Sequence, residues 1–225
     1  MSETGDRSWG HLADTECFGR SCLNSDYVII SKEDLNLPQY KKSTQACHCM
    51  IYSRHTDKVF GIYHPRAAVL MQMRFDGYIG FPGGLIDEGE DLVHGLNREL
   101  VEEINLDIEK VPVQEEHYIV SHWNSKQQLS LHFYAREVSL EDFKQIEQNS
   151  LLADDYGSEV MGLLRVPLYT MGDGYRGFPT FLTNAFVGNS RQQLLHTLNH
   201  LGLMSKDEIS KALSAKPVPV DPVMD

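Results

Sequence analysis

The stretch from Gly84 to Leu106 reads GLIDEGEDLVHGLNRELVEEINL and decides most of what this sequence predicts. On a helix that turns about 100° per residue, Glu99, Glu102 and Glu103 fall within an arc of roughly 100°. Like charges this close repel, so the arrangement needs solvent or a bound cation to offset the repulsion. Clustered carboxylate oxygens suit Mg²⁺ or Mn²⁺, which makes a divalent metal site the first hypothesis.

The apolar residues of this helix show where it packs. They form a stripe about a quarter turn from the glutamates, at Leu92, Val93, Leu96, Leu100 and Ile104. The carboxylates are therefore expected at the rim of the core, beside a cleft. Upstream, the apolar run 67–73 leads to Phe81-Pro82-Gly83-Gly84. We expect a strand that feeds a glycine turn, where the backbone can take positive φ and approach a ligand.

This segment resembles the Nudix box, the signature of the Nudix hydrolases. The pattern runs Gly, five residues, Glu, seven residues, then Arg-Glu-apolar-any-Glu-Glu-any-Gly-apolar. The matching positions are Gly84, Glu90, Arg98, Glu99, Leu100, Glu102, Glu103 and Leu106. Six matches to specified Gly, Glu or Arg arise by chance in a chain of this length with a probability on the order of 10⁻⁵. Asn105 replaces the last glycine, and because Asn tolerates the left-handed conformation, the helix can still end there.

The alternative is a solvated acidic helix face, which is what most runs of charge are. The glutamates alone do not exclude it. The combination with Gly83-Gly84 and Arg98 favours the metal site, because an arginine can hold a neighbouring carboxylate in a fixed orientation. We expect Arg98 to give structural support and not to take part in the chemistry.

Composition predicts a single enzyme domain. The chain has 225 residues, of which 41% are hydrophobic, enough to bury a full core. No apolar run approaches the ~20 residues of a membrane span and the first ten residues lack signal-peptide character, so a soluble intracellular protein with no membrane partner is expected. Cysteines at positions 17, 22, 47 and 49 are expected to be reduced thiols; a zinc site is an alternative that their spacing disfavours.

The net charge of −12 limits the kinds of partner. A protein that binds nucleic acid through its general electrostatic field would be basic. No DNA partner is therefore expected, and any affinity for RNA must come from a local patch or from the metal site.

The order of elements predicts a mixed α/β fold. Strands are expected at 27–30, 46–53, 67–73, 117–122, 129–137 and 159–166, and helices at 91–104, 140–148, 191–201 and 206–213. Ser190 with Gln193, and Ser205 with Glu208, have capping-box spacing at the starts of the last two helices. Residues 1–40 are expected to be a poorly structured extension, 41–214 the catalytic domain, and 215–225 a disordered tail.

From about Ala46 to Leu203 the chain is similar to the small nucleolar RNA-decapping Nudix hydrolases, which also act as inosine diphosphate phosphatases. The similarity lies in segments such as AVLMQMRFDGYIGFPGG, GLNREL, LHFYAR, GLLRVPLYT and GFPTFLTNAF. It implies the α/β/α Nudix sandwich with a central mixed sheet, Mg²⁺ or Mn²⁺ as cofactor, and a homodimer. It also implies a nuclear location, in the nucleolus or nucleoplasm, with the cytoplasm as an additional location.

The resemblance also assigns roles to residues. Glu99, Glu102 and Glu103 would bind the metal, with Glu159 as a further ligand from another element. Glu103 and Glu99 would be catalytic, and the site chemistry favours Glu103 as the base that accepts a proton from water. The residues that match the nucleotide-binding positions are His48, Arg74, Phe81 and Gln193, with Asn189 close by.

Each of these residues has a structural alternative. Glu159 is otherwise a surface strand residue, and His48 a strand histidine whose hydrogen bonds are satisfied. Arg74 is otherwise a surface ion-pair partner, Phe81 a core aromatic, and Gln193 the third residue of its capping box.

Three functions remain open on the sequence. The first is a hydrolase of RNA 5′ caps and of purine diphosphates such as inosine diphosphate. The second is a hydrolase of free or protein-linked ADP-ribose, which the same box would serve because substrate choice lies in the pocket. The third is a catalytically silent, syndesmos-like protein that binds RNA or protein, and the unbroken box disfavours it.

Overall fold

A single mixed sheet organises the structure, a computed structural model that describes residues 26–217. The strands are β1 (Tyr27–Ile30), β2 (Thr44–Arg54), β3 (Ala67–Arg74), β4 (Ile79–Gly80), β5 (Gly83–Ile86), β6 (Tyr118–Asn124), β7 (Leu129–Glu137) and β8 (Val160–Arg165). Their order is β1-β6-β7-β2-β3-β4, with β5 paired to β2 and β8 paired to β3. The pairing of β2 with β7 is parallel, whereas its pairings with β3 and β5 are antiparallel.

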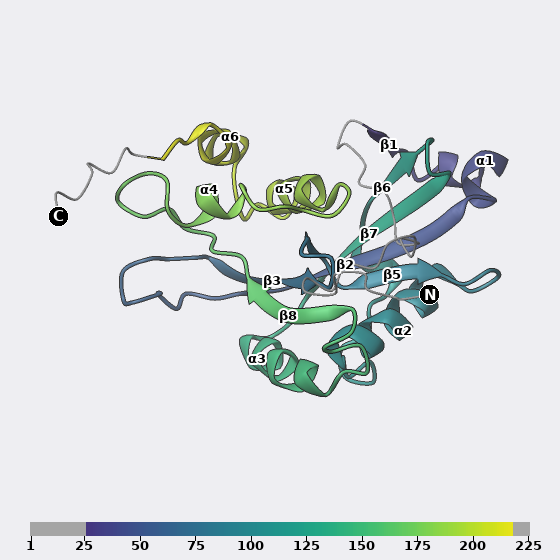
Figure 1. Cartoon of the computed structure of the whole chain (residues 1–225), viewed down its shortest axis with the longest axis horizontal. Helices are drawn as coiled ribbons and strands as arrows, with labels where there is room; N and C mark the ends of the chain where they lie inside the picture. The colour runs from purple at the N-terminus through teal and green to yellow at the C-terminus, as the bar shows by residue number, and fades with distance from the viewer. Residues whose placement is uncertain (1–25, 218–225) are drawn as a thin grey trace, which may run out of the picture.

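Helices cover both faces of this sheet (Figure 1). The α-helices are α1 (Pro38–Lys41), α2 (Leu92–Ile104), α3 (Leu140–Asn149), α4 (Phe178–Phe181), α5 (Ser190–His200) and α6 (Lys206–Ser214). Short 3₁₀ helices are η2 (Asp34–Asn36), η3 (Glu115–His117) and η4 (Ser150–Leu152). α2 and α3 lie on one side of the sheet, and α4, α5 and α6 lie on the other.

The alternation of side chains along β2 builds a core on each face. Cys49 and Ile51 pack with α2 and α3, whereas Met50 and Tyr52 pack with α4, α5 and α6. All four side chains are buried. A strand covered on both faces reads as a continuous apolar run, which is how 46–52 reads in the sequence. The predicted α/β/α sandwich with a central mixed sheet is confirmed.

The predicted strands and long helices lie within two residues of the observed bounds, and β7 matches at both ends. Two short strands and two short helices, β4, β5, α1 and α4, were not predicted. The expected glycine turn is wrong in one respect, because Gly83–Ile86 is a strand that pairs with β2. Gly83 does take a positive φ of 126°, and a Cβ there would lie 2.2 Å from the carbonyl oxygen of Cys47.

The described part of the N-terminal extension belongs to the sheet. Tyr27–Ile30 forms edge strand β1 as the pattern predicts, and it pairs antiparallel with β6. The expectation that residues 1–40 are poorly structured therefore does not hold for this part, because its partner strand lies about a hundred residues away along the chain. Residues 1–25 and 218–225, including Cys17, Cys22 and most of the predicted tail, lie outside the described residues.

Two of the three helix caps predicted from the sequence agree with the structure. Asn105 ends α2 with φ 50° in the left-handed region, as predicted, whereas Asp91, expected as the first helical residue, is the cap at its start. Ser205 and Glu208 form the expected capping box of α6. The capping box predicted at Ser190 is wrong: the cap of α5 is Asn189.

The thiols of Cys47 and Cys49 are free and buried. Burial raises the pKa of Cys47 far above its ordinary value and that of Cys49 to about 12. These two cysteines are the reduced thiols that the sequence predicts, and their burial keeps them neutral. In residues 26–217, no helix is both long enough and apolar enough to cross a membrane.

Two buried histidines predict a loss of stability in acid. Burial lowers the pKa of His122, beside His196, and that of His132 from 6.5 to about 4. The folded state therefore favours the neutral rings, so their contribution is complete above pH 6.5 and is lost as the pH falls towards 4, at up to about 3 kcal/mol each. Urea unfolding from pH 7.5 to 4.5 should show this decline. A His122→Leu variant should decline less steeply, and an equal slope in both proteins would contradict the prediction.

Candidate active site

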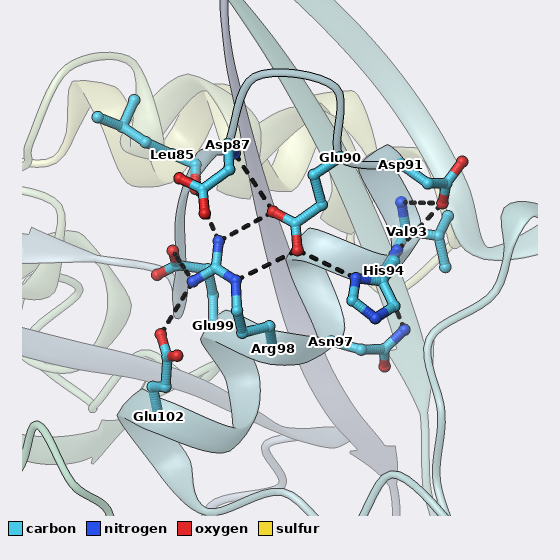
Figure 2. Close-up of polar contacts among 10 residues, drawn as sticks. All are labelled: Leu85, Asp87, Glu90, Asp91, Val93, His94, Asn97, Arg98, Glu99 and Glu102. Carbon is cyan, nitrogen blue, oxygen red and sulfur yellow. Dashed lines mark hydrogen bonds and ion pairs between the residues drawn. The ribbon is translucent and has the colours of Figure 1, made fainter.

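Helix α2 presents the acidic residues because both of its ends are held. The carboxylate of Asp91 accepts hydrogen bonds from the backbone N–H groups of Val93 and His94, at 3.0 and 3.1 Å (Figure 2). At the other end, the N–H groups of Asn105 and Leu106 donate back into the last turn. These caps satisfy backbone groups that the helix leaves free. The register of the glutamates on the helix is therefore fixed.

Arg98 contacts three glutamates at once (Figure 2). Its Nη1 lies 2.8 Å from Glu99 Oε1 and 3.0 Å from Glu102 Oε2, and its Nη2 lies 3.1 Å from Glu90 Oε2. Nη2 also donates to the carbonyl oxygen of Leu85, at 3.2 Å. One guanidinium therefore orients three carboxylates and ties them to β5, which is the supporting role that the sequence predicts.

The support is electrostatic as well as geometric. Hydrogen bonds from Arg98, and then from His94, hold the pKa of Glu90 down at about 2. The pKa of Arg98 is raised by its hydrogen bond to Glu90 and by Glu99. Glu90 is therefore a permanently charged partner of Arg98.

Two glycines of the Nudix box leave room for carboxylates. A Cβ on Gly84 would lie 2.3 Å from Glu99 Oε2, and a Cβ on Gly95 would lie 2.6 Å from Glu90 Oε2. Gly84 does not take a positive φ, so its role is space and not backbone conformation. The pattern asks for glycine at Gly84 because Glu99 packs directly against it.

Glu103 differs from the other glutamates of the cluster. Its side chain is buried, with 3% exposure, and Oε2 accepts a hydrogen bond from the Gly83 N–H at 2.6 Å. The expectation that all three carboxylates lie at the rim is therefore wrong for this one. Burial raises its pKa to about 8, against the opposing hydrogen bonds from Gly83 and from the side chain of Gln72. Glu103 joins α2 to the positive-φ glycine of β5.

Glu159 comes from a loop that lies beside the end of α2. The N–H of Asp155 donates to the carbonyl oxygen of Glu102, and the N–H of Phe75 donates to that of Glu159. Glu159 is exposed and immediately precedes β8. The pKa of Glu99 is raised by burial first, despite Arg98, and then by the negative charges of Glu102 and Glu159. The fourth carboxylate predicted from another element therefore stands within electrostatic range of the cluster.

The donor set has the chemistry of a hard divalent cation site. Its oxygens come from carboxylates whose charges oppose one another, which a cation would offset. Across residues 26–217, however, no three acidic, histidine or cysteine side chains converge into a ready-made cage. Oxygens of Glu99 and Glu102 are instead bonded to Arg98. The residues fit a metal by donor type and net charge.

His48 and Arg74 lie next to Glu103. His48 pairs with Gly83 across β2 and β5, and burial, together with Arg74, lowers the pKa of His48 to about 4. Arg74 also acts electrostatically on Glu103 and makes a 3.1 Å ion pair with Asp76. The structure therefore brings two of the predicted nucleotide-binding residues beside the Nudix box. Arg74 also has the surface ion pair that was its structural alternative.

The other predicted nucleotide-binding residues are buried. Phe81 is 3% exposed and packs its edge against Phe133, with ring centroids 4.8 Å apart, as a core aromatic would. Asn189 and Gln193 are also buried, and neither amide nitrogen has a hydrogen-bond partner. His48 Nδ1 lacks a partner as well. Unpaired buried donors cost about 1–3 kcal/mol each, so these groups need water or a ligand.

Comparison of the sequence with known proteins identifies its family. The family model described as "Nudt16-like: U8 snoRNA-decapping enzyme-like" matches residues 45–204. The chain belongs to the Nudt16-like family. It is 61% identical to the U8 snoRNA-decapping enzyme of Homalodisca vitripennis over 182 residues, which cover 81% of this chain and 97% of that protein. It is 43% identical to the U8 snoRNA-decapping enzyme of Xenopus laevis, over 83% of this chain and 88% of that protein.

The chain is also similar to proteins that are not named as decapping enzymes. The chain is 41% identical to the human Tudor-interacting repair regulator protein, over 76% of this chain and 81% of that protein. That name describes an interaction and not a reaction.

In this Nudt16-like chain, sequence reasoning missed three buried polar residues, of which Gln72 belongs to the acidic cluster. Gln72 bonds Glu103. Thr197 is fully buried with an unpartnered hydroxyl, and His122 is fully buried with both ring nitrogens unpartnered. The signal for Thr197 was its spacing, because Asn189, Gln193 and Thr197 recur every four residues on one face of α5. No sequence signal marks Gln72 or His122, which arrive from β3 and β6.

The packing of Glu99 on Gly84 predicts that Gly84→Ala lowers activity without unfolding the protein. A methyl group there must displace the flexible end of Glu99, so the carboxylate leaves its contact with Arg98 while the backbone stays allowed. We expect a loss of at least about tenfold in kcat, with a melting temperature within a few degrees of wild type. Gly172→Ala, which has open space and no positive φ, is the matched control and should leave both values unchanged. Full activity of Gly84→Ala would contradict the role of Glu99.

Proposed function

We propose that this protein is a metal-dependent hydrolase of phosphoanhydride bonds that removes the 5′ cap of RNA, snoRNA or mRNA, and converts inosine or deoxyinosine diphosphate to the monophosphate. One observation carries the proposal: the acidic cluster ordered by Arg98 lies beside His48, and unpaired polar atoms remain on His48, Asn189 and Gln193. These three residues make up the proposed nucleotide pocket. The similarity to U8 snoRNA-decapping enzymes over almost their full length supports capped RNA as a substrate.

The residues proposed for metal binding and catalysis lie on α2 and immediately before β8. Glu99, Glu102, Glu103 and Glu159 would hold Mg²⁺ or Mn²⁺, which when bound supplies positive charge for the phosphoryl oxygens and for the attacking water. Arg98 keeps Glu99 and Glu102 oriented. Glu103, with its raised pKa and its bond to Gly83, is the candidate to accept the proton of water. Glu99 is the second catalytic carboxylate.

The free polar atoms of the pocket favour a base with acceptors on its edge. The amide nitrogens of Asn189 and Gln193 are donors without partners. An oxo-purine such as hypoxanthine presents two acceptors on one edge, whereas adenine places an amino donor there. This complementarity supports inosine diphosphate over adenosine diphosphate. It also disfavours ADP-ribose, the alternative substrate that the Nudix box would serve equally well.

The second alternative is a protein that binds a partner and catalyses no reaction. The similarity to a protein named as Tudor-interacting supports this alternative. In this chain six of the seven Gly, Glu and Arg positions of the Nudix box are present, and only the last glycine is replaced, by Asn105. Glu99 and Glu102 also retain their contacts with Arg98. A protein that only binds a partner has no need of that arrangement, which is why we propose the enzyme. A homodimer and a nuclear or nucleolar location are further proposals that rest on the family resemblance.

The function is tested with a substrate panel in Mg²⁺ and in Mn²⁺. Capped RNA and inosine diphosphate should be cleaved faster than ADP-ribose, and chelation should stop the reaction. Glu103→Gln keeps an oxygen for the Gly83 N–H but cannot accept the proton, so kcat should fall by at least about 10²-fold while the fold persists. Glu109→Gln, at an exposed position outside the cluster, is the control. Release of no product from any substrate would favour the non-catalytic alternative.

The unpaired donor of Gln193 predicts a role in base choice. Gln193→Ala should lower the ratio of kcat/KM for inosine over adenosine diphosphate by roughly tenfold, since a lost hydrogen bond to a buried base edge is worth about 1–3 kcal/mol. Metal affinity should be unaffected. If Gln193 is only structural, the melting temperature will fall while the substrate ratio stays constant. Both quantities should therefore be measured on the same variant.

A further inference from the structure

A groove of about 620 Å³ lies between α5 and α6. Among residues 26–217, no aspartate or glutamate lines it. Its principal lining residues are Arg191, Gln192, Leu195, Lys206, Ile209 and Leu213. Two of these side chains are cationic. A carboxylate-free groove with two cations is unusual in a protein of net charge −12, and it is the kind of local patch through which an acidic protein can attract a polyanion.

The cations of this groove are not neutralised by the protein. Six of the eight arginines in residues 26–217 form an ion pair with a carboxylate, and Arg191 is not among them. The guanidinium of Arg191 makes one long contact, 3.4 Å, to the carbonyl oxygen of Leu182. Lys206 is exposed at the start of α6 and likewise has no carboxylate partner in the described chain. Both side chains are therefore available to an external anion.

A neighbouring polar group also lacks a partner. The amide oxygen of Gln192 is buried and accepts no hydrogen bond. It would be satisfied by a donor such as a ribose 2′-hydroxyl or a base N–H. The groove therefore offers cations for phosphates and an acceptor for the sugar or the base, while Leu195, Ile209 and Leu213 supply apolar surface.

Helix α5 connects this groove to the nucleotide pocket. Asn189 and Gln193 face the buried side of the helix, whereas Arg191 and Gln192 line the groove in the same first turn. Because an α-helix is only about 10–12 Å across with its side chains, one or two nucleotides span that turn. An RNA strand whose terminal nucleotide lies in the nucleotide pocket can therefore reach the groove.

We propose that this groove binds the single-stranded RNA chain next to the scissile cap, with Arg191 and Lys206 contacting backbone phosphates. The inference rests on the proposed decapping function and assigns it a second contact surface. An acidic peptide of a protein partner is the competing occupant, and its chemistry differs because it carries no phosphodiester backbone and no 2′-hydroxyl.

The test compares long and short substrates in an Arg191→Ala/Lys206→Ala variant. For a capped RNA of about 25 nucleotides, kcat/KM should fall roughly tenfold through KM, and the slope of log binding constant against log salt should fall by about 1.4, from two phosphate contacts at about 0.7 each. Hydrolysis of inosine diphosphate, which does not reach the groove, should remain at the wild-type rate. Arg191→Lys, which keeps the charge, should recover most of the loss.

The control variant is Lys58→Ala/Lys144→Ala, which removes the same charge from exposed positions away from the groove. It should leave both substrates unaffected. If wild type cleaves capped RNA and the groove variant does so equally well, the groove does not bind RNA and the peptide becomes its occupant. If wild type fails to cleave capped RNA, the proposed function has failed; fluorescence anisotropy with a 5′-phosphorylated RNA then decides the groove, and equal binding by wild type and variant overturns it.

Discussion

Repulsion between carboxylates governs how α2 and β5 are built around the acidic cluster. α2 carries Glu99, Glu102 and Glu103 within about one turn, and Glu90 lies against the same helix through Gly95. Arg98 resolves part of the repulsion by bonding three of these groups. The glycines at positions 84 and 95 follow from it, because a larger residue at either position would push a carboxylate out of the arrangement. What remains uncompensated is the charge that a divalent cation would offset.

Burial separates Glu103 from its neighbours. Glu90 keeps a pKa of about 2 because Arg98 bonds it, whereas burial raises that of Glu103 to about 8. Glu90 and Glu103 belong to the same motif but have opposite tendencies, and the difference comes from environment and not from residue type. The contact of Glu103 with Gly83 also places it at the junction of β2, β5 and α2, where His48 and Arg74 meet the acidic cluster.

The face of α5 towards the sheet carries the unpaired polar groups that support the proposed nucleotide pocket. Asn189, Gln193 and Thr197 are buried and leave polar atoms without partners, and His122 does the same from the sheet. Such groups destabilise a dry core by about 1–3 kcal/mol each, so a fold that keeps several of them together gains from water or from a ligand with matching edges. The same helix also carries Arg191, one of the two cations of the α5–α6 groove. Helix α5 thus has unpaired polar groups on its buried face and a cationic side chain in the groove.

The sequence by itself determined the features that depend on local spacing. The limits of α2, its left-handed end at Asn105, the alternation of β7 and the capping box of Ser205 each follow from the conformational preferences of a few adjacent residues. The Nudix box belongs to this group, because its residues lie within about two dozen positions. The resemblance of longer segments added the proposed nucleotide-binding residues, which local physics alone would have assigned to structural roles.

Tertiary structure decided everything that depends on contacts between distant segments. Gly83–Ile86 is a strand only because β2 accepts it, and β1 is ordered in the sheet because β6 pairs with it. The burial of Glu103, its bond from Gln72 and the packing of Phe81 on Phe133 likewise required the completed fold. The cap of α5 fell at Asn189 because Ser190 Oγ donates to the carbonyl oxygen of Ile79, more than a hundred residues earlier. A sequence pattern records which groups are present, but desolvation and hydrogen bonding depend on which other groups the fold brings to them.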